Sequence, residues 1–279
     1  MAAREILDPE VKTLERAMSA RFGWQTGASW RDGLLDAIKT KAARLKLDKA
    51  AYCRLAISSP GELEMLGEAV SNSETRFFRD INQFDALSKL VVPELIRRRG
   101  GERRLDLWSA ACSTGEEPYS LAIVLRESLP KNEGWQTSLF ATDMRGAAII
   151  SASRGRYRSS SIGMLDSDRR NKYFTKADAN GREEFYDIEP SVRSMVAFQR
   201  ANIYDHQFWK NMNRKFDLVV CNNILIYFHA LAVKQTVERI ASVLKPDGLL
   251  VVTDNEAGYV NHLALKLDPS LPGHFFRKV

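Results

Sequence analysis

The most informative stretch of this chain is Ser109-Ala-Ala-Cys-Ser-Thr-Gly-Glu-Glu-Pro-Tyr-Ser120. The apolar run Leu105–Trp108 precedes it and predicts a strand, and Tyr119–Leu125 follows with the apolar spacing of a helix. A strand, a turn of small residues and a helix bring free backbone N–H groups to a place that a ligand can approach closely. The pattern therefore predicts a site for a nucleotide-like ligand. A plain connection of the same kind without a ligand is the alternative.

The glycine content of the turn narrows the ligand class. The dinucleotide fingerprint Gly-x-Gly-x-x-Gly needs three glycines, and only Gly115 is present. Ala111, Ser113 and Gly115 instead give a small-x-small-x-Gly pattern. This pattern fits the looser turn of enzymes that bind S-adenosylmethionine (SAM), a cofactor without a pyrophosphate.

Composition indicates an ordinary soluble protein. The chain has 279 residues, of which 44% are hydrophobic and 27% charged, enough for one large or two modest domains. No stretch approaches the roughly 20 apolar residues of a membrane span, and the N-terminus lacks the apolar core of a signal peptide. Three widely spaced cysteines and four scattered histidines predict buried thiols and no metal site. We expect a cytoplasmic monomer that does not insert into membranes.

A basic stretch lies near the N-terminus, within a net charge of +6. It suggests a dock for an acidic partner surface, and a solvated helix face is the alternative. Tyr52 is the one aromatic residue among the charges, too few for stacking with bases, so we expect no nucleic-acid partner. The basic residues are Lys39, Lys41, Arg44, Lys46, Lys49 and Arg54.

Two different patterns divide the chain. Residues 10–70 show helical spacing, with Asp48 and Ser59 as N-caps, and residues 82–99 predict a further helix. Short apolar runs at 105–108, 138–142, 196–199, 218–221 and 249–253 then alternate with helices at 117–129, 145–154 and 230–244, which predicts a mainly parallel sheet. We expect a helical domain over 1–75, a linker helix region over 76–101 and a ligand-binding domain over 102–279.

Residues 156–194 interrupt the alternation. They are polar, with one turn at Asp178–Gly181 and a second near Pro190, between the runs Phe185–Ile188 and Met195–Phe198. We interpret them as a small antiparallel insert.

Polar residues follow three predicted strands, where ligands bind in open α/β sheets. Asp143 can accept ribose hydroxyl groups or cap the next helix. Asn202 can form hydrogen bonds with the edge of an adenine ring, and Ile203 can pack on its face, although asparagine is also a common turn residue. Asn222 and Asn223 suit hydrogen bonds to the polar end of a ligand.

The segment Ser73-Glu-Thr-Arg-Phe-Phe-Arg-Asp80 joins the two regions. Phe77 and Phe78 are expected to anchor it in a core. Arg79 then suits either a local salt bridge or an anionic group in the cleft, because its planar fork matches a carboxylate.

Together these motifs resemble the CheR-type chemotaxis receptor methyltransferases. The resemblance rests on residues 73–80 and 108–120, on Ala-Thr-Asp at 141–143, on Ile-Tyr-Phe at 226–228 and on Leu-Lys-Pro-Asp-Gly at 244–248. It implies a class I methyltransferase fold, Rossmann-like, with a seven-stranded, mainly parallel sheet, an N-terminal helical domain and a small β-subdomain. It also implies SAM-dependent methylation of glutamate side chains in chemoreceptors, giving a γ-methyl ester and S-adenosylhomocysteine (SAH).

The resemblance also assigns site residues. It implies that Arg79 and Tyr227 flank the transferred methyl group. The cofactor contacts that it and the turn imply are Ser73, Thr75, Arg79, Ala111, Ser113, Gly115, Glu117, Asp143, Asn202, Ile203, Asn222 and Asn223. The partner would be the cytoplasmic helical domain of a receptor.

Three positions depart from the family pattern. Asn222 stands where arginine is usual, Ser73 where asparagine is common, and Thr253–Glu256 where the family often has Gly-His-Ser-Glu. The loss of a positive charge at position 222 motivates an alternative: a SAM-binding regulatory module that docks without turnover. A methyltransferase for another protein or a small molecule is the third hypothesis. A glutamate acceptor is already ionised at neutral pH and needs no strong general base.

Overall fold

The structure is a computed structural model that describes residues 8–26, 28–71, 74–130, 133–177 and 184–279. Contacts divide the chain into two compact units. One comprises Met1–Asn72 with Tyr227–Val233, and the other comprises Ser73–Ile226 with Lys234–Val279.

The helical unit contains the helices expected from the sequence: α1 (Pro9–Phe22), α2 (Ala28–Leu45), α3 (Lys49–Ser58) and α4 (Pro60–Val70). Both predicted N-caps are confirmed, because Asp48 Oδ1 accepts from the N–H of Ala51 at 2.7 Å and Ser59 Oγ from that of Glu62 at 3.3 Å. The apolar faces meet in a core that includes Leu14, Met18, Phe22, Leu34, Ile38, Tyr52 and Leu66.

A segment from much later in the chain completes this unit. Tyr227 accepts a backbone hydrogen bond from Gln25 (2.8 Å), and the N–H of His229 donates to Gly23 (2.9 Å). Phe228 is buried and forms a β-bridge with Trp24. The helical unit therefore depends on residues outside the N-terminal 75.

The larger unit is built on a seven-stranded sheet with strand order β6-β2-β1-β7-β8-β10-β9. Only β10 runs opposite to the others, because it pairs antiparallel with both β8 and β9. The mainly parallel sheet is thus confirmed, and five of its strands were expected. The strands are β1 (Arg104–Ala110), β2 (Gln136–Asp143), β6 (Val196–Arg200), β7 (Phe216–Val220), β8 (Leu244–Val252), β9 (Leu265–Leu267) and β10 (His274–Lys278).

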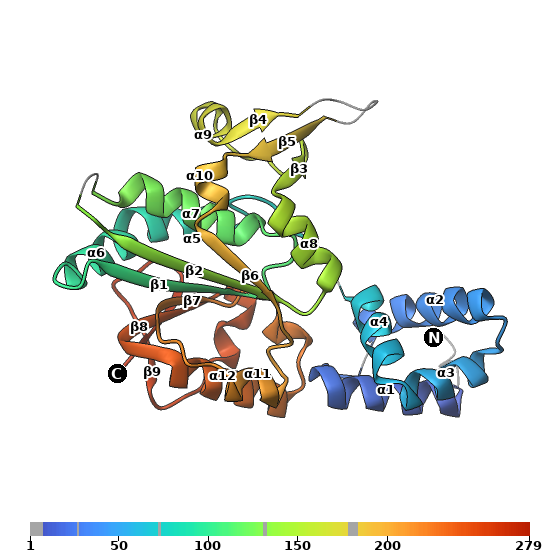
Figure 1. The fold of residues 1–279 in the computed structure, drawn as a ribbon. Helices are drawn as coiled ribbons and strands as arrows, with labels where there is room; N and C mark the ends of the chain where they lie inside the picture. The colour runs from blue at the N-terminus through green and yellow to red at the C-terminus, as the bar shows by residue number, and fades with distance from the viewer. Residues whose placement is uncertain (1–7, 27, 72–73, 131–132, 178–183) are drawn as a thin grey trace, which may run out of the picture. The chain divides into compact units, whose positions relative to one another are not determined.

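Helices cover both faces of this sheet (Figure 1). Helices α7 (Glu116–Ser128) and α8 (Gly146–Arg154) lie on one face, and α11 (His206–Lys210) with residues 234–243 of α12 (Ala230–Val243) lie on the other. The five adjacent strands β6, β2, β1, β7 and β8 are parallel, so their carboxyl ends meet along one edge, where β1 leads into the Ser109–Ser120 stretch. This edge carries the site.

The helix expected over 82–99 contains a π-helical turn. Helix α5 (Ile81–Ala86) continues as η1 (Leu87–Val91) and then α6 (Val92–Arg98). Pro93 explains the wider turn, since proline has no N–H to donate and its ring crowds the carbonyl four residues earlier. The segment Lys245–Gly248, part of the motif at 244–248, lies inside β8, where the pairing with β7 shifts register.

The antiparallel insert is confirmed, with a different pairing from the one expected. It consists of β3 (Arg156–Arg158), β4 (Phe174–Lys176) and β5 (Phe185–Ile188) in the order β3-β5-β4, with α9 (Ser167–Tyr173) and α10 (Pro190–Arg193). The run at 195–198 is not part of the insert, because residues 196–200 form β6 and pair parallel with β2. Helix α10 separates the two runs. The turn expected at Asp178–Gly181 lies outside the described residues.

The three cysteines are free and buried, as predicted. Among the described residues, no group of histidine, cysteine or acidic side chains is arranged to hold a metal ion. No helix in the described part of the chain has the length and apolar character to cross a membrane.

Candidate functional site

The turn after β1 holds three residues in the left-handed region within five positions. The φ angles are 59° at Ala111, 50° at Ser113 and 96° at Gly115. Residues with a Cβ adopt this conformation at a cost, which indicates that surrounding contacts hold the turn. Gly115 is small for packing reasons, because a Cβ there would lie 2.8 Å from the Cβ of Ala152 and 2.9 Å from the hydroxyl of Tyr157.

Asp143 fixes this turn from the end of β2. Its Oδ2 accepts from the N–H of Ser113 at 2.8 Å, and its Oδ1 from the N–H of Arg145 at 2.9 Å. The Arg145 guanidinium also reaches the Ser113 hydroxyl at 2.9 Å. Asp143 is buried. Each carboxylate oxygen has a second lone pair, so Asp143 can support the turn and still accept a ligand hydroxyl.

Glu117, in the first turn of α7, is the most perturbed acid of the site. Its Oε1 accepts from the Ser109 hydroxyl at 2.6 Å and its Oε2 from the Asn222 amide at 3.0 Å. Burial raises the pKa of this carboxyl to about 7, although both hydrogen bonds lower it; the charge of Glu256 raises it further and that of Arg79 lowers it. A carboxyl that titrates near neutral pH suits a site for a cationic ligand.

Asn222 links Glu117 to a residue that sequence reasoning missed. Its Nδ2 donates to Gln83 Oε1 at 2.7 Å, and Gln83 Nε2 donates back to Asn222 Oδ1 at 3.3 Å. Gln83 lies on α5, and the two amides are 139 positions apart in the chain. No local pattern could have revealed this pair.

Glu256 is a second missed residue. Its fully buried carboxylate accepts the backbone N–H groups of Asn223, Ile224 and Leu225 at 2.7, 2.7 and 2.8 Å. It lies in η3 (Asp254–Tyr259), where it also accepts from Thr253 Oγ1 at 2.6 Å. Asn223 is held at φ 58°. Asn223 is therefore positioned through its backbone by Glu256, which keeps the loop after β7 beside Glu117.

Asn202 and Ile203 lie after β6, as expected, but in a closed turn. Asn202 Oδ1 accepts from the N–H of Tyr204 at 2.9 Å, and the Asn202 carbonyl accepts from Asp205 at 2.9 Å. Ile203 is buried. The turn role of Asn202 is thus present, and contact of either residue with an adenine ring stays a prediction.

The Ser73–Asp80 segment is anchored as predicted. Phe77 and Phe78 are buried, and the N–H of Phe78 donates to the Ser120 hydroxyl at 3.0 Å. Arg79 is exposed, and its guanidinium donates to the carbonyl of Glu74 at 2.8 Å.

The remaining predicted contacts are less constrained. Thr75 is half-buried, and Ser73 lies outside the described residues. Tyr227 ends the short helix η2 (Leu225–Tyr227) and belongs to the helical unit, whereas Arg79 belongs to the larger unit. The approach of Arg79 and Tyr227 to one methyl group therefore stays a prediction.

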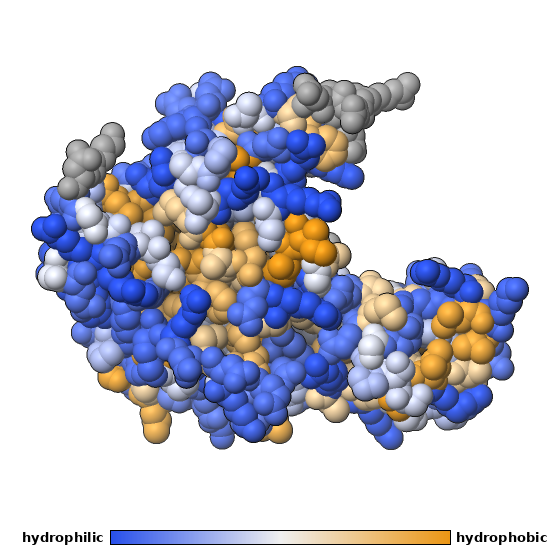
Figure 2. All heavy atoms as spheres, in the orientation of Figure 1, coloured by the Kyte–Doolittle hydropathy of each residue, from blue (hydrophilic) through white to orange (hydrophobic). Residues whose placement is uncertain are grey.

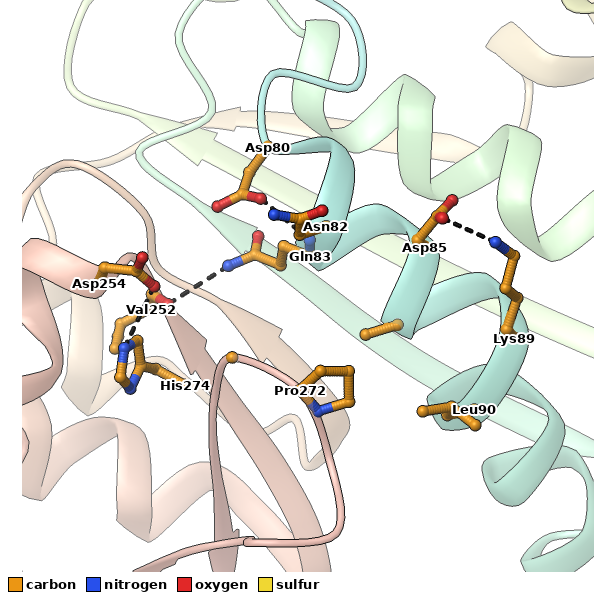
Figure 3. Close-up of a pocket in the computed structure, with 12 residues that line it drawn as sticks. Asp80, Asn82, Gln83, Asp85, Lys89, Leu90, Val252, Asp254, Pro272 and His274 are labelled. Carbon is orange, nitrogen blue, oxygen red and sulfur yellow. Dashed lines mark hydrogen bonds and ion pairs between the residues drawn. The ribbon is translucent and has the colours of Figure 1, made fainter.

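A pocket of about 480 Å³ opens between α5 and the carboxyl end of β8. Lys89 pairs with Asp85 at 2.7 Å, the His274 imidazole contacts Asp254 at 3.1 Å, and Asp80 accepts from the N–H of Gln83 at 2.9 Å. Figure 3 shows the Gln83 amide reaching across the pocket wall toward Val252. None of the cofactor-binding or catalytic residues predicted from the sequence lines this pocket.

The sheet order and its single reversed strand, with an acid at the end of β2, define a class I SAM-dependent methyltransferase. Residues 73–266 match the family model described as "CheR methyltransferase, SAM binding domain". The chain belongs to this CheR methyltransferase family and binds SAM as its cofactor.

Curated relatives agree with this assignment. Chemotaxis protein methyltransferase 1 of Pseudomonas aeruginosa is 38% identical over 208 residues, which is 73% of each chain. Chemotaxis protein methyltransferase Cher2 of Pseudomonas putida is 37% identical over 201 residues, covering 71% of this chain and 70% of the relative. Chemotaxis protein methyltransferase of Salmonella typhimurium is 33% identical, covering 71% and 66%.

Proposed function

We propose that this enzyme transfers the methyl group of SAM to glutamate side chains in the cytoplasmic region of bacterial chemoreceptors, giving glutamate γ-methyl esters and SAH. The observation that carries the proposal is the match of residues 73–266 to the CheR family. The polar groups at the carboxyl edge of the sheet support it.

The donor set at this edge fits SAM. Asp143 has acceptor capacity for a ribose diol. Glu117 offers a carboxylate for the cationic end of the cofactor, with Asn222 as its hydrogen-bond donor. When bound, SAM supplies an electrophilic methyl group on a positively charged sulfur.

The methyl transfer requires no proton transfer by the protein. A carboxylate oxygen of the acceptor forms the new bond to the methyl carbon, the carbon–sulfur bond breaks, and its electron pair stays on sulfur. No proton moves, so no general base is needed. Arg79 would orient the acceptor carboxylate and Tyr227 would wall the methyl group, so that alignment supplies roughly 7–11 kcal/mol of the barrier reduction.

The basic stretch of the helical unit is the proposed receptor dock. Five of its residues are exposed, namely Lys39, Arg44, Lys46, Lys49 and Arg54. The sixth residue, Lys41, is half-buried and pairs with Glu62 at 2.9 Å, so we expect it to contribute less to the dock. Leu45 and Leu47 are exposed between the charges, and Figure 2 shows hydrophobic atoms on the α2–α3 side of this unit. Such a mixed surface favours an acidic helical partner over a small molecule.

The test is methyl transfer from labelled SAM to receptor cytoplasmic fragments by the enzyme, which we propose to be a cytoplasmic monomer. Label that mild base releases as methanol indicates an ester. Because Asn222 removes the usual arginine, a SAM-binding regulatory module is the second candidate. Measurable SAM binding with no transfer at saturating SAM would favour that candidate over the enzyme.

A further inference from the structure

Gln83 is a long polar side chain with only 5% of its surface exposed, and all of its hydrogen-bonding groups are engaged. Nε2 donates to Asn222 Oδ1 and to the carbonyl of Val252, each at 3.3 Å. Oε1 accepts from Asn222 Nδ2 at 2.7 Å. Burying a polar amide costs free energy, and an apolar helix-forming residue could fill this position of α5. The buried amide therefore indicates a role beyond folding.

The two amides fix one another's orientation. The Val252 carbonyl can only accept, so it requires the NH₂ end of Gln83 on its side. Gln83 Oε1 must then face Asn222 Nδ2, whose second N–H points to Glu117 Oε2 at 3.0 Å. A flipped Asn222 would place its carbonyl oxygen against the Glu117 carboxylate. The direction of the amide at position 222 is therefore dictated from β8 through Gln83.

We propose that Gln83 is a positioning residue of the cofactor site, which acts through Asn222 by holding its amide donor on the Glu117 carboxylate. The inference rests on the proposed function, because it takes from it the contact of Glu117 with the cationic end of the cofactor. Gln83 does not contact Glu117 itself but reaches it through Asn222. Gln83 also lines the pocket in Figure 3.

The consequence is electrostatic. The Ser109 hydroxyl and the Asn222 amide donate to Glu117, the charge of Glu256 opposes its ionisation and that of Arg79 favours it. Without Gln83, the Asn222 amide is free to turn away, and one of the two donors is lost. The pKa of Glu117 then rises further, and less of the carboxylate is ionised at pH 7.

The test is calorimetric titration with SAH between pH 6 and 8.5. Wild-type affinity should rise with pH as Glu117 ionises. Gln83→Leu should bind roughly three- to tenfold more weakly at pH 7 and approach wild type at the upper pH limit. Asn82→Leu is the matched control, because Asn82 is an exposed neighbour on the same helix that lines the same pocket. If Gln83→Leu weakened SAH binding by the same factor at every pH, Gln83 would act only through packing, and the proposal would be overturned.

A double variant makes the test specific to Glu117. In a Glu117→Gln background the titrating group is gone, so Gln83→Leu should weaken SAH binding less than it does in wild type. An undiminished effect there would contradict the proposal. If Gln83→Leu does not fold, Gln83→Met keeps the side-chain length and allows the same comparison. No acceptor is present, so failure of methyl transfer to receptor fragments would reject the proposed function while this result stands.

Discussion

Asp143 Oδ2 lies 2.8 Å from the backbone nitrogen of Ser113, so the acid that ends β2 holds the turn that follows β1. The sequence predicted two separate roles for Asp143, ribose binding or helix capping. The capping role is wrong, because α8 begins after Arg145 and no side chain caps it. The structure adds another role, because the hydrogen bond stabilises a left-handed Ser113 at φ 50°. One side chain thus links the shape of the turn to the place where the cofactor ribose is proposed to bind.

Asp143→Ala should therefore weaken SAM binding by about 1.5–3 kcal/mol, through loss of charge-assisted hydrogen bonds to the ribose and through a looser turn. Calorimetry on the folded variant checks the loss. Asp143→Asn separates the two effects, since it keeps one acceptor oxygen and should lie between wild type and the alanine variant. Unchanged affinity in Asp143→Ala would place the ribose elsewhere.

The carboxyl of Glu117 predicts opposite pH effects on binding and on stability. Its pKa in the folded protein is about 7, above the usual value near 4.3, so the folded state holds a proton that the unfolded chain has released. This contribution to stability is present below about pH 4.3 and is lost as pH rises to 7. SAM affinity should instead rise through pH 7, because its cationic groups favour the ionised carboxyl.

The variant Glu117→Gln tests the predicted pH effects on both stability and SAM affinity. It should make the unliganded protein more stable than wild type at pH 8, by about 1–3 kcal/mol, and should abolish the pH dependence of SAM binding between pH 6 and 8. Denaturation and calorimetry at these pH values provide the measurements. Glu133→Gln, an exposed control, should change neither quantity. A wild-type protein whose SAM affinity is flat across this range would contradict the assignment.

Arg79 and Tyr227 are predicted to act on the reacting groups. Arg79 is exposed and its guanidinium donates to the Glu74 carbonyl within the same loop, so Arg79→Ala should leave the fold intact. Turnover should fall at least about tenfold with a smaller loss of SAM affinity, as expected for lost orientation of the acceptor. Tyr227→Phe should keep the backbone hydrogen bond to Gln25 and lose rate. Normal turnover of both variants at saturating substrate would remove them from the reaction.

Local sequence patterns predicted the parts of the fold that local physics controls. Side-chain spacing and turn chemistry predict the N-caps Asp48 and Ser59, the five parallel strands and the alternating helices. The strand β9 has only three residues and forms because β10 pairs with it. The apolar spacing of the sequence therefore did not predict β9 or β10. The π-helical turn before Pro93 likewise depends on how one proline is accommodated inside a packed helix.

The candidate site divides in the same way. Asp143, Asn202 and Asn222 were found because polar residues at strand ends stand out against apolar runs. Gln83 and Glu256 look like ordinary helix and loop residues, and their roles arise from partners 139 and 33 positions away. Only the fold brings these groups together, so composition and spacing could not reveal them.

The basic stretch predicts a salt-sensitive encounter with the receptor. Exposed charges act over about 8–10 Å at ordinary salt, so methylation of receptor fragments should weaken as salt rises while SAM affinity changes little. Replacing Lys39, Arg44 and Lys46 with Glu should raise the KM for the fragment. The control reverses Arg97, Lys210 and Lys266, three exposed cations of the larger unit. Equal salt sensitivity of the wild type and the first triple variant would leave the stretch as a solvated helix face.

Asn222 predicts that SAM binding is weaker than an arginine at this position would give. A charge-assisted hydrogen bond contributes roughly 1.5–3 kcal/mol and a neutral one about 1 kcal/mol, so arginine should tighten binding about three- to thirtyfold. The structure shows why the single variant Asn222→Arg is a poor test. Gln83 Oε1 lies 2.7 Å from the Asn222 amide nitrogen and occupies the space that a guanidinium needs.

The double variant Gln83→Ala with Asn222→Arg removes this obstruction. It should bind SAM more tightly than wild type, because the guanidinium can reach the Glu117 carboxylate and hold it ionised. Gln83→Ala alone should bind more weakly than wild type, which separates the new charge from the added space. Calorimetry at pH 6 is the sharpest comparison, since the wild-type carboxyl is then mostly protonated and the arginine gain is largest. A double variant no tighter than Gln83→Ala at that pH would show that charge at position 222 does not govern cofactor affinity.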